Sequence, residues 1–276
     1  MAISPQRLME LEELCRKFRI DIIEILHQRQ SGHPGGSLSA VEIMTALYFE
    51  IANASPENFS SPDRDRIVLT KGHVAPILYR VLAEKGYFPV EEMTTLRTIN
   101  SRLQGHPCTH DGMGIELSTG PLGIGFAAAV GMALANRLMG NDAWVYTVSG
   151  DGELNEGVVW EAVMSAAKYK LDHLVMIIDN NGVQLDGTND EIMPMPDLAR
   201  RFEAFGCHVI ECDGHDISAI CESIDIAKNN IGKPTVLIAK TIKGKGVSFM
   251  EGKNTWHGAP IDDASYNTAM IELRGE

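Results

Sequence analysis

Two polar side chains lie where they could hold a metal ion together. Asp151, with a glycine on each side, comes just after the apolar segment 144–148, and Asn181 comes just after the apolar segment 174–178. These segments are predicted strands joined by a helix at 156–169, a unit that brings parallel strand ends to one edge of a sheet. A carboxylate and an amide oxygen suit Mg²⁺, and flanking glycines let phosphate groups approach the backbone. The spacing therefore predicts a metal–diphosphate site, although either motif alone is also typical of an ordinary turn.

The elements that must position this site alternate between strands and helices. Helical patterns separate five apolar segments of strand length, at residues 67–70, 144–148, 174–178, 208–212 and 235–241. Such alternation predicts a parallel sheet covered on both faces, with ligands at the carboxyl ends of its strands. We expect an α/β fold with a doubly wound, mostly parallel sheet and helices on both faces.

The N-terminal segment of about 60 residues is expected to be mainly helical. Apolar residues recur at steps of three and four over residues 7–30, which predicts an amphipathic helix. Ser39, with Glu42 three residues later, predicts the capping box of a second helix that runs to about residue 52. We expect one diphosphate-binding domain over residues 1–276, with this helical segment packed on it.

Four histidines next to glycines form a second candidate group. They are His33, His73, His106 and His257, and the neighbouring glycines place them in loops. A single loop histidine is usually solvated, but four in glycine-rich loops favour a site built from loops. Imidazole suits proton transfer among the hydroxyl groups of a sugar near neutral pH. The basic segment 243–246 belongs to this site or is a solvated turn.

Eight short segments of the chain resemble the motifs of one enzyme family, the transketolases. They are SGHPGG at 31–36, KGH at 71–73, GHP at 105–107, STGPLGIG at 118–125, GDGELNEG at 150–157, IIDNNGVQLDG at 177–187, KTIKGKG at 240–246 and WHGAP at 256–260. The fifth and sixth segments together resemble the thiamine diphosphate motif in its transketolase form. The resemblance covers nearly the whole chain, and the collinear order is more specific than any single segment.

The resemblance implies a thiamine diphosphate site with a bound metal ion. The metal ligands would be the side chains of Asp151 and Asn181 and the carbonyl of Val183, with Mg²⁺ as the ion and Ca²⁺ or Mn²⁺ as substitutes. The cofactor would be bound by Lys71, His73, Gly120, Leu122, Gly152, Glu153, Asn181, Lys243 and His257.

The resemblance also implies catalytic residues. These would be His33, His73, His106, His257 and Glu161, with the histidines near the reacting centre and along the substrate channel. Glu161 would act with Glu156 in a carboxylate relay between two cofactor sites. Glu156 is also explained as a favourable charge at a helix N-terminus.

By family, the reaction would be transfer of a two-carbon ketol group from a ketose phosphate to an aldose phosphate, as in the pentose phosphate pathway. Because the chain ends at Glu276, soon after the last motif, we expect a second polypeptide to supply the pyrimidine-binding half and its glutamate. Two copies of each chain would give an α₂β₂ assembly. The alternatives are a related enzyme, such as a dihydroxyacetone or deoxyxylulose phosphate synthase, and a catalytically silent regulatory subunit.

Composition argues against several other classes of protein. The formal net charge is −13, and the sequence shows no basic cluster of the kind that binds nucleic acid. No apolar stretch approaches the 18 residues of a membrane span. Five cysteines without a C-x-x-C pair, and an acidic N-terminus without a signal sequence, favour the cytoplasm.

Two other motifs resemble binding sites but each lacks a required feature. His106, Cys108 and His110 would be a zinc site only with a fourth ligand, and no suitable Cys or His follows. Residues 123–128 fit a G-x-G-x-x-A dinucleotide fingerprint. That fingerprint should directly follow a strand, but residues 118–121 precede it here. Its acidic residue should lie at the end of the next strand, whereas the candidate, Asp142, lies before that strand. We therefore do not expect NAD binding.

Overall fold

A five-stranded parallel sheet lies at the centre of the computed structural model, which describes residues 3–109 and 113–275. The strand order is β1-β2-β3-β5-β4, and all neighbouring strands are parallel. The strands are β1 (Arg66–Leu69), β2 (Val145–Gly150), β3 (Leu174–Asn180), β4 (His208–Asp213) and β5 (Thr235–Lys240). The predicted parallel α/β fold is confirmed.

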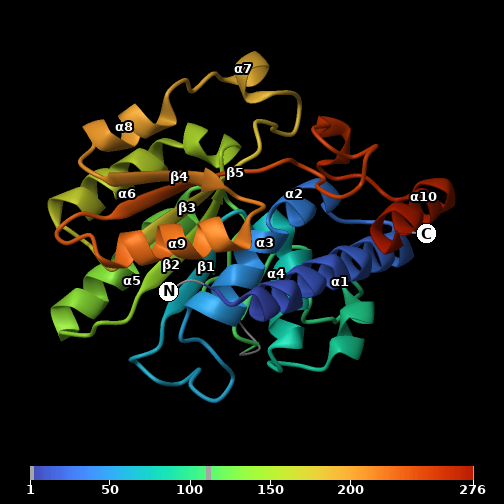
Figure 1. Ribbon diagram of the computed structural model, residues 1–276, viewed down its shortest axis with the longest axis horizontal. Helices are drawn as coiled ribbons and strands as arrows, with labels where there is room; N and C mark the ends of the chain where they lie inside the picture. Colours follow the sequence, from blue (N-terminus) through green and yellow to red (C-terminus); the bar gives the residue numbers. More distant parts are fainter. Residues whose placement is uncertain (1–2, 110–112, 276) are drawn as a thin grey trace.

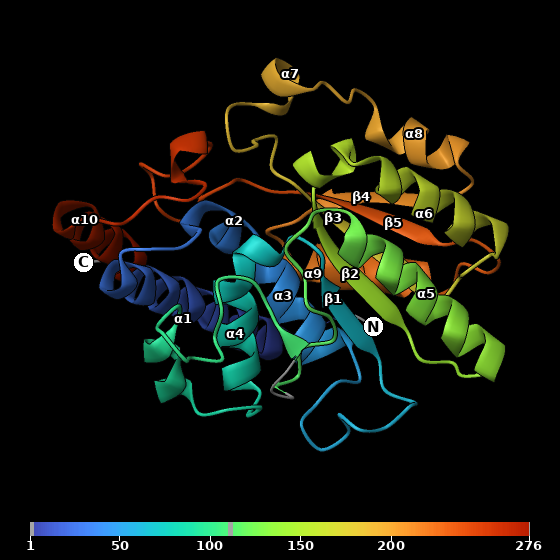
Figure 2. The same ribbon diagram turned by 180° about the vertical axis from the view of Figure 1, so that it is seen from behind.

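Helices cover both faces of this sheet (Figures 1 and 2). One face carries α5 (Ile124–Met139), α6 (Gly157–Lys168) and α8 (Leu198–Ala204), and the other carries α1 (Pro5–Arg29), α3 (Val41–Ala46), α4 (Ala75–Glu84) and α9 (Ile217–Lys228). The central strand β3 serves both cores. Val175 and Ile177 pack on the α1 side, whereas Leu174, Met176 and Ile178 pack on the α5 side. A strand that is apolar on both faces is typical of a parallel sheet.

The longest helix, α1, is capped as its sequence suggests. The Ser4 hydroxyl accepts a hydrogen bond from the Arg7 N–H at 3.2 Å, and a proline occupies the first turn. The helix packs against α3, α4 and the C-terminal helix α10 (Asp263–Arg274). Helix α10 was not predicted, because only Ala269, Met270 and Leu273 are buried, too few to make an apolar stripe.

The predicted helix from Ser39 to about residue 52 was wrong in its start and in its capping. The structure has α2 (Pro34–Ser39), α3 and a π-helical turn at Leu47–Ile51 in its place. The Ser39 hydroxyl donates to the carboxylate of Asp179 at 2.5 Å, and Glu42 pairs with Arg19. Tertiary partners therefore take both side chains that the capping-box pattern assigned to a helix end.

Short turns complete the described chain. They are 3₁₀ turns at Gly72–Val74, Val90–Thr95, Gly152–Asn155 and Asn254–Trp256, and the one-turn helix α7 (Asn189–Ile192). The turn at Val90–Thr95 does not continue as a helix, because Arg97 and Asn100 adopt left-handed backbone conformations with φ of 58° and 65°.

The carboxyl ends of β1, β2, β3 and β5 meet at one edge of the sheet. Gly150 at the end of β2 lies opposite Asp179 in β3, and Asn180 lies opposite Lys240 at the end of β5. The prediction that one crossover brings Asp151 and Asn181 to neighbouring strand ends is confirmed.

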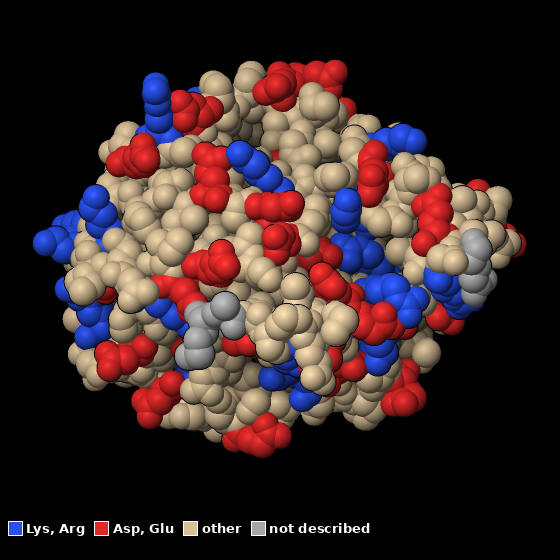
Figure 3. Space-filling view, in the orientation of Figure 1, with Lys and Arg blue, Asp and Glu red and all other residues tan. Residues whose placement is uncertain are grey.

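The surface carries charges of both signs. On the face shown in Figure 3, Lys and Arg side chains lie among Asp and Glu side chains and do not gather into one continuous patch. Among the residues that the structure describes, no helix is both long enough and apolar enough to span a membrane.

Truncation of a fully buried side chain in α1 is expected to destabilise the fold. Ile22 has no exposed surface, so Ile22→Ala should lower the free energy of unfolding by about 2–5 kcal/mol in urea titrations. Met9 in the same helix is 61% exposed, and Met9→Ala should change the free energy of unfolding by less than about 0.5 kcal/mol. Equal effects of the two substitutions would contradict the packing of α1.

Candidate functional site

A cavity of about 280 Å³ opens at the carboxyl edge of the sheet. Every residue predicted to bind the cofactor or the metal lines it. The lining residues are Gly36, Lys71, His73, Gly120, Leu122, Gly150, Asp151, Gly152, Glu153, Asn181, Val183, Gln184, Leu185, Lys243 and His257. Gln184 and Leu185 were not predicted, although their position directly after the Asn-Asn-Gly turn could have indicated them.

Asp151 is held by the backbone on both sides of the crossover. Its Oδ1 accepts from the Gly152 N–H at 2.8 Å, and its Oδ2 accepts from the Gly182 N–H at 2.6 Å. The side chain is 5% exposed, and burial, with the nearby charge of Asp179, raises its pKa. Each oxygen keeps a lone pair for a cation, which would relieve the cost of burying the charge.

Asn181 and Val183 place two more oxygen atoms beside Asp151. Asn181 Oδ1 accepts from the Val183 N–H at 3.1 Å, which closes a tight turn over Gly182 at φ 76°. The Val183 carbonyl faces the same cavity. One carboxylate, one amide oxygen and one carbonyl form a donor set for a hard divalent cation. In residues 3–109 and 113–275, no cluster of three His, Cys, Asp or Glu side chains offers a softer metal site.

Two buried lysines supply positive charge to the cavity. Lys71 forms an ion pair with Asp179, and the two residues are 2% and 0% exposed. Lys243 Nζ donates to the carbonyls of Val183 and Gln184 at 3.0 and 3.1 Å. Burial lowers the pKa of Lys243 to about 8. Asp179 neutralises Lys71, so Lys243 is the cation better placed to balance a diphosphate.

Glu153 holds the turn that would face the diphosphate. Its Oε1 accepts from the Gly123 N–H at 2.7 Å, and its Oε2 accepts from the Thr70 hydroxyl at 2.7 Å. The residue is 1% exposed, and burial raises its pKa. A side chain at Gly152 would approach Gln184 Cγ to 3.0 Å, so glycine leaves the space that a phosphate group would need.

The four predicted histidines form one cluster, of which His73 and His257 line the cavity. The His33 ring lies 5.3, 5.5 and 6.3 Å from the rings of His73, His257 and His106, and His73 stacks on His257 at 4.9 Å. His257 Nδ1 also lies 3.0 Å from Lys243 Nζ, which connects the cluster to the cavity. These loops are far apart in the sequence, so the fold creates the cluster.

The histidines are held in their neutral form. Burial, together with the charge of Arg97, lowers the pKa of His33 to about 4, and burial with the charge of Lys243 does the same for His257. Burial also places the pKa of His73 well below its usual value and lowers that of His106. Neutral imidazoles can each donate or accept one proton, which suits proton transfer among hydroxyl groups.

The structure does not bring Glu161 into this site. Glu161 lies on the exposed side of α6, and Glu156 is exposed at the N-cap of the same helix. A relay between them would need groups outside the described chain, so that role stays a prediction. The zinc alternative cannot be traced, because His110 lies outside the described residues.

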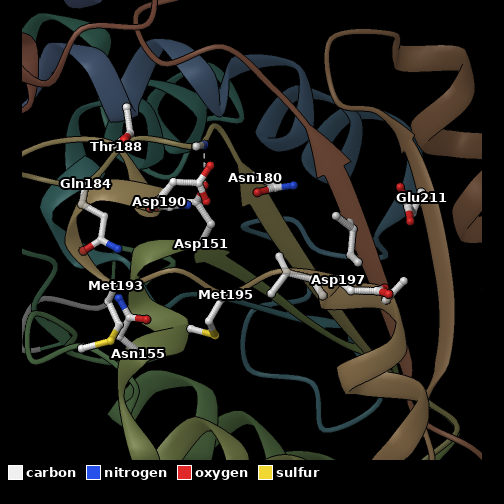
Figure 4. A pocket seen from close by; sticks show the side chains of 15 residues that line it. Asp151, Asn155, Asn180, Gln184, Thr188, Asp190, Met193, Met195, Asp197 and Glu211 are labelled. Carbon is white, nitrogen blue, oxygen red and sulfur yellow. Dashed lines mark hydrogen bonds between the residues drawn. The ribbon is translucent and has the colours of Figure 1, made fainter.

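A second hollow of about 350 Å³ lies on the other side of Asp151, under the segment 182–197 (Figure 4). Asp151 and Gln184 line both spaces. The labelled side chains of this hollow include Asp190, Asp197 and Glu211 and no lysine, arginine or histidine (Figure 4). An anion would be repelled there, so the cavity with Lys243 is the diphosphate candidate. Together the fold and the cavity that Lys243 lines define a class of protein, a parallel α/β domain with a polar ligand cavity at its strand ends.

Comparison with known proteins agrees with this geometry. A family model described as the transketolase thiamine diphosphate-binding domain matches residues 11–273. The 6-deoxy-6-sulfo-D-fructose transketolase subunit of a Clostridium species is 42% identical over 97% of this chain and 98% of its own length. An apulose-4-phosphate transketolase subunit from Actinobacillus succinogenes is 41% identical over 97% of both chains.

A solved structure shares the fold. The transketolase of Pichia stipitis in complex with sedoheptulose-7-phosphate matches with a TM-score of 0.90 and 30% identity, over 96% of this chain. The chain spans 40% of the length of that transketolase. The chain belongs to the transketolase family and corresponds to its thiamine diphosphate-binding domain. The predicted family, fold and thiamine diphosphate cofactor are confirmed.

Removal of the Asp151 charge is expected to weaken metal-dependent cofactor binding. Asp151→Asn should raise the Kd for thiamine diphosphate at low Mg²⁺ by roughly ten- to hundred-fold, as measured by calorimetry. Asp186→Asn is the matched control, because Asp186 is exposed on the same loop and does not line the cavity. An unchanged Kd in Asp151→Asn would contradict the assignment of the metal site.

The histidine cluster is expected to make stability depend on pH. The pKa values of His33 and His257 are about 4 in the folded chain, so the unfolded chain binds more protons between about pH 4 and 6.5. The free energy of unfolding should therefore be highest above pH 6.5, and it should decrease as the pH falls from about 6.5 to about 4. NMR titration, with each resonance assigned by a His→Gln variant, should give midpoints far below 6.5. Midpoints near 6.5 would contradict the buried environment.

Proposed function

We propose that the chain is the N-terminal subunit of a transketolase that uses thiamine diphosphate and Mg²⁺ to move a two-carbon ketol group from a ketose phosphate to an aldose phosphate. The observation that carries this proposal is the single cavity that joins the Asp151 oxygens, the buried amine of Lys243 and the neutral histidine cluster. Residues 1–276 would act as one diphosphate-binding domain, with α1 to α3 as its N-terminal helical part.

The residues divide into those that bind and those that move protons. Asp151, Asn181 and the Val183 carbonyl would hold Mg²⁺, with Ca²⁺ or Mn²⁺ as substitutes, and Lys243 would balance the charge of the diphosphate. Thiamine diphosphate, when bound, supplies the carbanion that accepts the ketol unit. The four clustered histidines would orient sugar hydroxyls and transfer protons among them, because neutral imidazole is both donor and acceptor.

A second subunit would supply the pyrimidine-binding glutamate. The buried carboxylates that line this cavity, Asp151 and Glu153, and Asp179 beside them already accept hydrogen bonds from the chain itself. Two relatives that share nearly the whole length of this chain carry the word subunit in their names. An α₂β₂ assembly would give each cofactor site residues from both kinds of chain, and Glu161 and Glu156 would belong to the carboxylate relay between two such sites that the family resemblance implies.

The substrates are proposed as sugar phosphates. One relative is named for a sulfosugar and another for apulose-4-phosphate, so the donor could differ from those of the pentose phosphate pathway. Acceptor choice would depend on the partner as well as on this chain, which keeps a dihydroxyacetone or deoxyxylulose phosphate synthase as the alternative. An intact cavity argues against a silent regulatory role. Five cysteines without a C-x-x-C pair support a cytoplasmic protein.

The proposal is tested by an assay of the chain alone and of the chain mixed with its partner. With thiamine diphosphate, Mg²⁺, a ketose phosphate and an aldose phosphate, we expect turnover only in the mixture, because residues 11–273 match only the thiamine diphosphate-binding domain of the family. A parallel assay with sulfosugar donors would define the substrate class. Full turnover by the chain alone would contradict the need for a second subunit.

A further inference from the structure

The segment 241–246, which carries Lys243 into the cavity, is bonded to the rest of the chain on two sides. On the inner side, the Thr241 hydroxyl donates to the carboxylate of Asp179. On the outer side, the Ile242 N–H donates to His215 Nε2 at 2.8 Å, and the Lys245 carbonyl accepts from Arg19 Nε at 3.0 Å. The outer bonds come from α1 and from the turn before α9, elements that do not line the cavity.

Both outer bonds converge on one carboxylate, that of Glu42 in α3. Arg19 binds Glu42 through two nitrogens, at 2.6 and 2.8 Å, and His215 Nδ1 lies 2.9 Å from Glu42 Oε2. The side chains of Arg19, Glu42 and His215 are 9%, 9% and 12% exposed. We call these three residues the Glu42 cluster.

The protonation of the Glu42 cluster follows from its bonds. His215 Nε2 accepts from the Ile242 N–H, so it carries no proton, and Nδ1 must be the nitrogen that donates to Glu42. Burial alone would raise the pKa of Glu42, but the His215 bond and the Arg19 charge outweigh it and hold this pKa low. A carboxylate at Glu42 therefore orients both groups that bind the segment 241–246.

We propose that Glu42 and His215 are positioning residues for the cofactor site, which act by fixing the backbone of residues 242 and 245 so that the Lys243 amine reaches the cavity. Lys243 Nζ lies within 3.1 Å of three acceptors, the Val183 and Gln184 carbonyls and His257 Nδ1. None of the groups in the Glu42 cluster lines the cavity, so the effect is transmitted through the segment 241–246. The part of this inference that concerns catalysis rests on the proposed function.

The acetylation rate of Lys243 measures whether the segment 241–246 is held in place. Its side chain is 2% exposed, and it should react slowly with an acetylating reagent while the segment is held. Lys71 is equally buried but is bound by Asp179 rather than by the Glu42 cluster, so it is an internal reference in the same sample. Mass spectrometry of the purified chain would give both acetylation rates without any cofactor or turnover.

Glu42→Gln is the first variant, and Glu116→Gln is its matched control. Glu116 also binds an arginine, Arg64, through two oxygens, and its side chain is 7% exposed, but it makes no contact with the segment 241–246. Glu42→Gln removes the charge that binds both Arg19 and His215. We expect this loss to raise the acetylation rate of Lys243 by about ten-fold and to leave that of Lys71 unchanged. Glu116→Gln should change neither rate.

A pair of substitutions at His215 separates positioning from space-filling. The amide of His215→Gln can place an acceptor where Nε2 lies, whereas His215→Asn can only replace the donor to Glu42. A cleft of about 530 Å³ borders this side chain and leaves room for either. His215→Asn is expected to raise the Lys243 rate by about five-fold, and His215→Gln should retain the wild-type rate. This pair decides the inference even if Glu42→Gln fails to fold.

Two results would overturn the inference. One is a Lys243 rate in Glu42→Gln no higher than in Glu116→Gln, and the other is equal rates in the two His215 variants. A separate measurement adds thiamine diphosphate and Mg²⁺ to the wild-type chain with its partner. Protection of Lys243 supports the cofactor site, whereas absent protection with the expected variant rates would contradict the proposed function and leave the positioning by Glu42 and His215 intact.

Discussion

The cavity depends on one buried carboxylate at the end of the central strand β3. Asp179 has no exposed surface and accepts hydrogen bonds from Lys71, Ser39 and Thr241, which belong to three different segments. Burial alone would raise its pKa, but the charge of Lys71 outweighs this and holds the pKa below its usual value. Removing one partner of a buried ion pair leaves an uncompensated charge. The segments that form three walls of the cavity are therefore fixed to one another.

This constraint also explains how an acidic protein can hold an anionic cofactor. With a net charge of −13, the chain repels anions at long range, so positive charge must be concentrated within the cavity. Asp179 neutralises Lys71, whereas Lys243 contacts two carbonyls and an imidazole, so no carboxylate of the described chain neutralises its charge. The same burial keeps His33 and His257 neutral, so they add hydrogen-bonding capacity without further charge.

The sequence predicted those parts of the structure that depend on local pattern. Glycines around Asp151 and the apolar run before Asn181 placed both residues at adjacent strand ends, because strand order follows from short crossovers. Partners distant in the sequence were not predictable in this way. Glu42 was predicted to be part of a capping box but pairs with Arg19 and His215. Helix α10 was not predicted, because it has too few buried apolar residues to give a helical pattern. The relay role of Glu161 stays a prediction, because Glu161 and Glu156 are both exposed and neither lines the cavity.

A crystal structure of the chain with its partner, thiamine diphosphate and Mn²⁺ would test most directly whether the cavity holds a metal–diphosphate unit. The anomalous signal of Mn²⁺ is expected within about 2.3 Å of oxygen atoms from Asp151, Asn181 and Val183, with the diphosphate beside Lys243. A Mn²⁺ peak in the acidic hollow under the segment 182–197, or a diphosphate outside the cavity that Lys243 lines, would contradict this assignment.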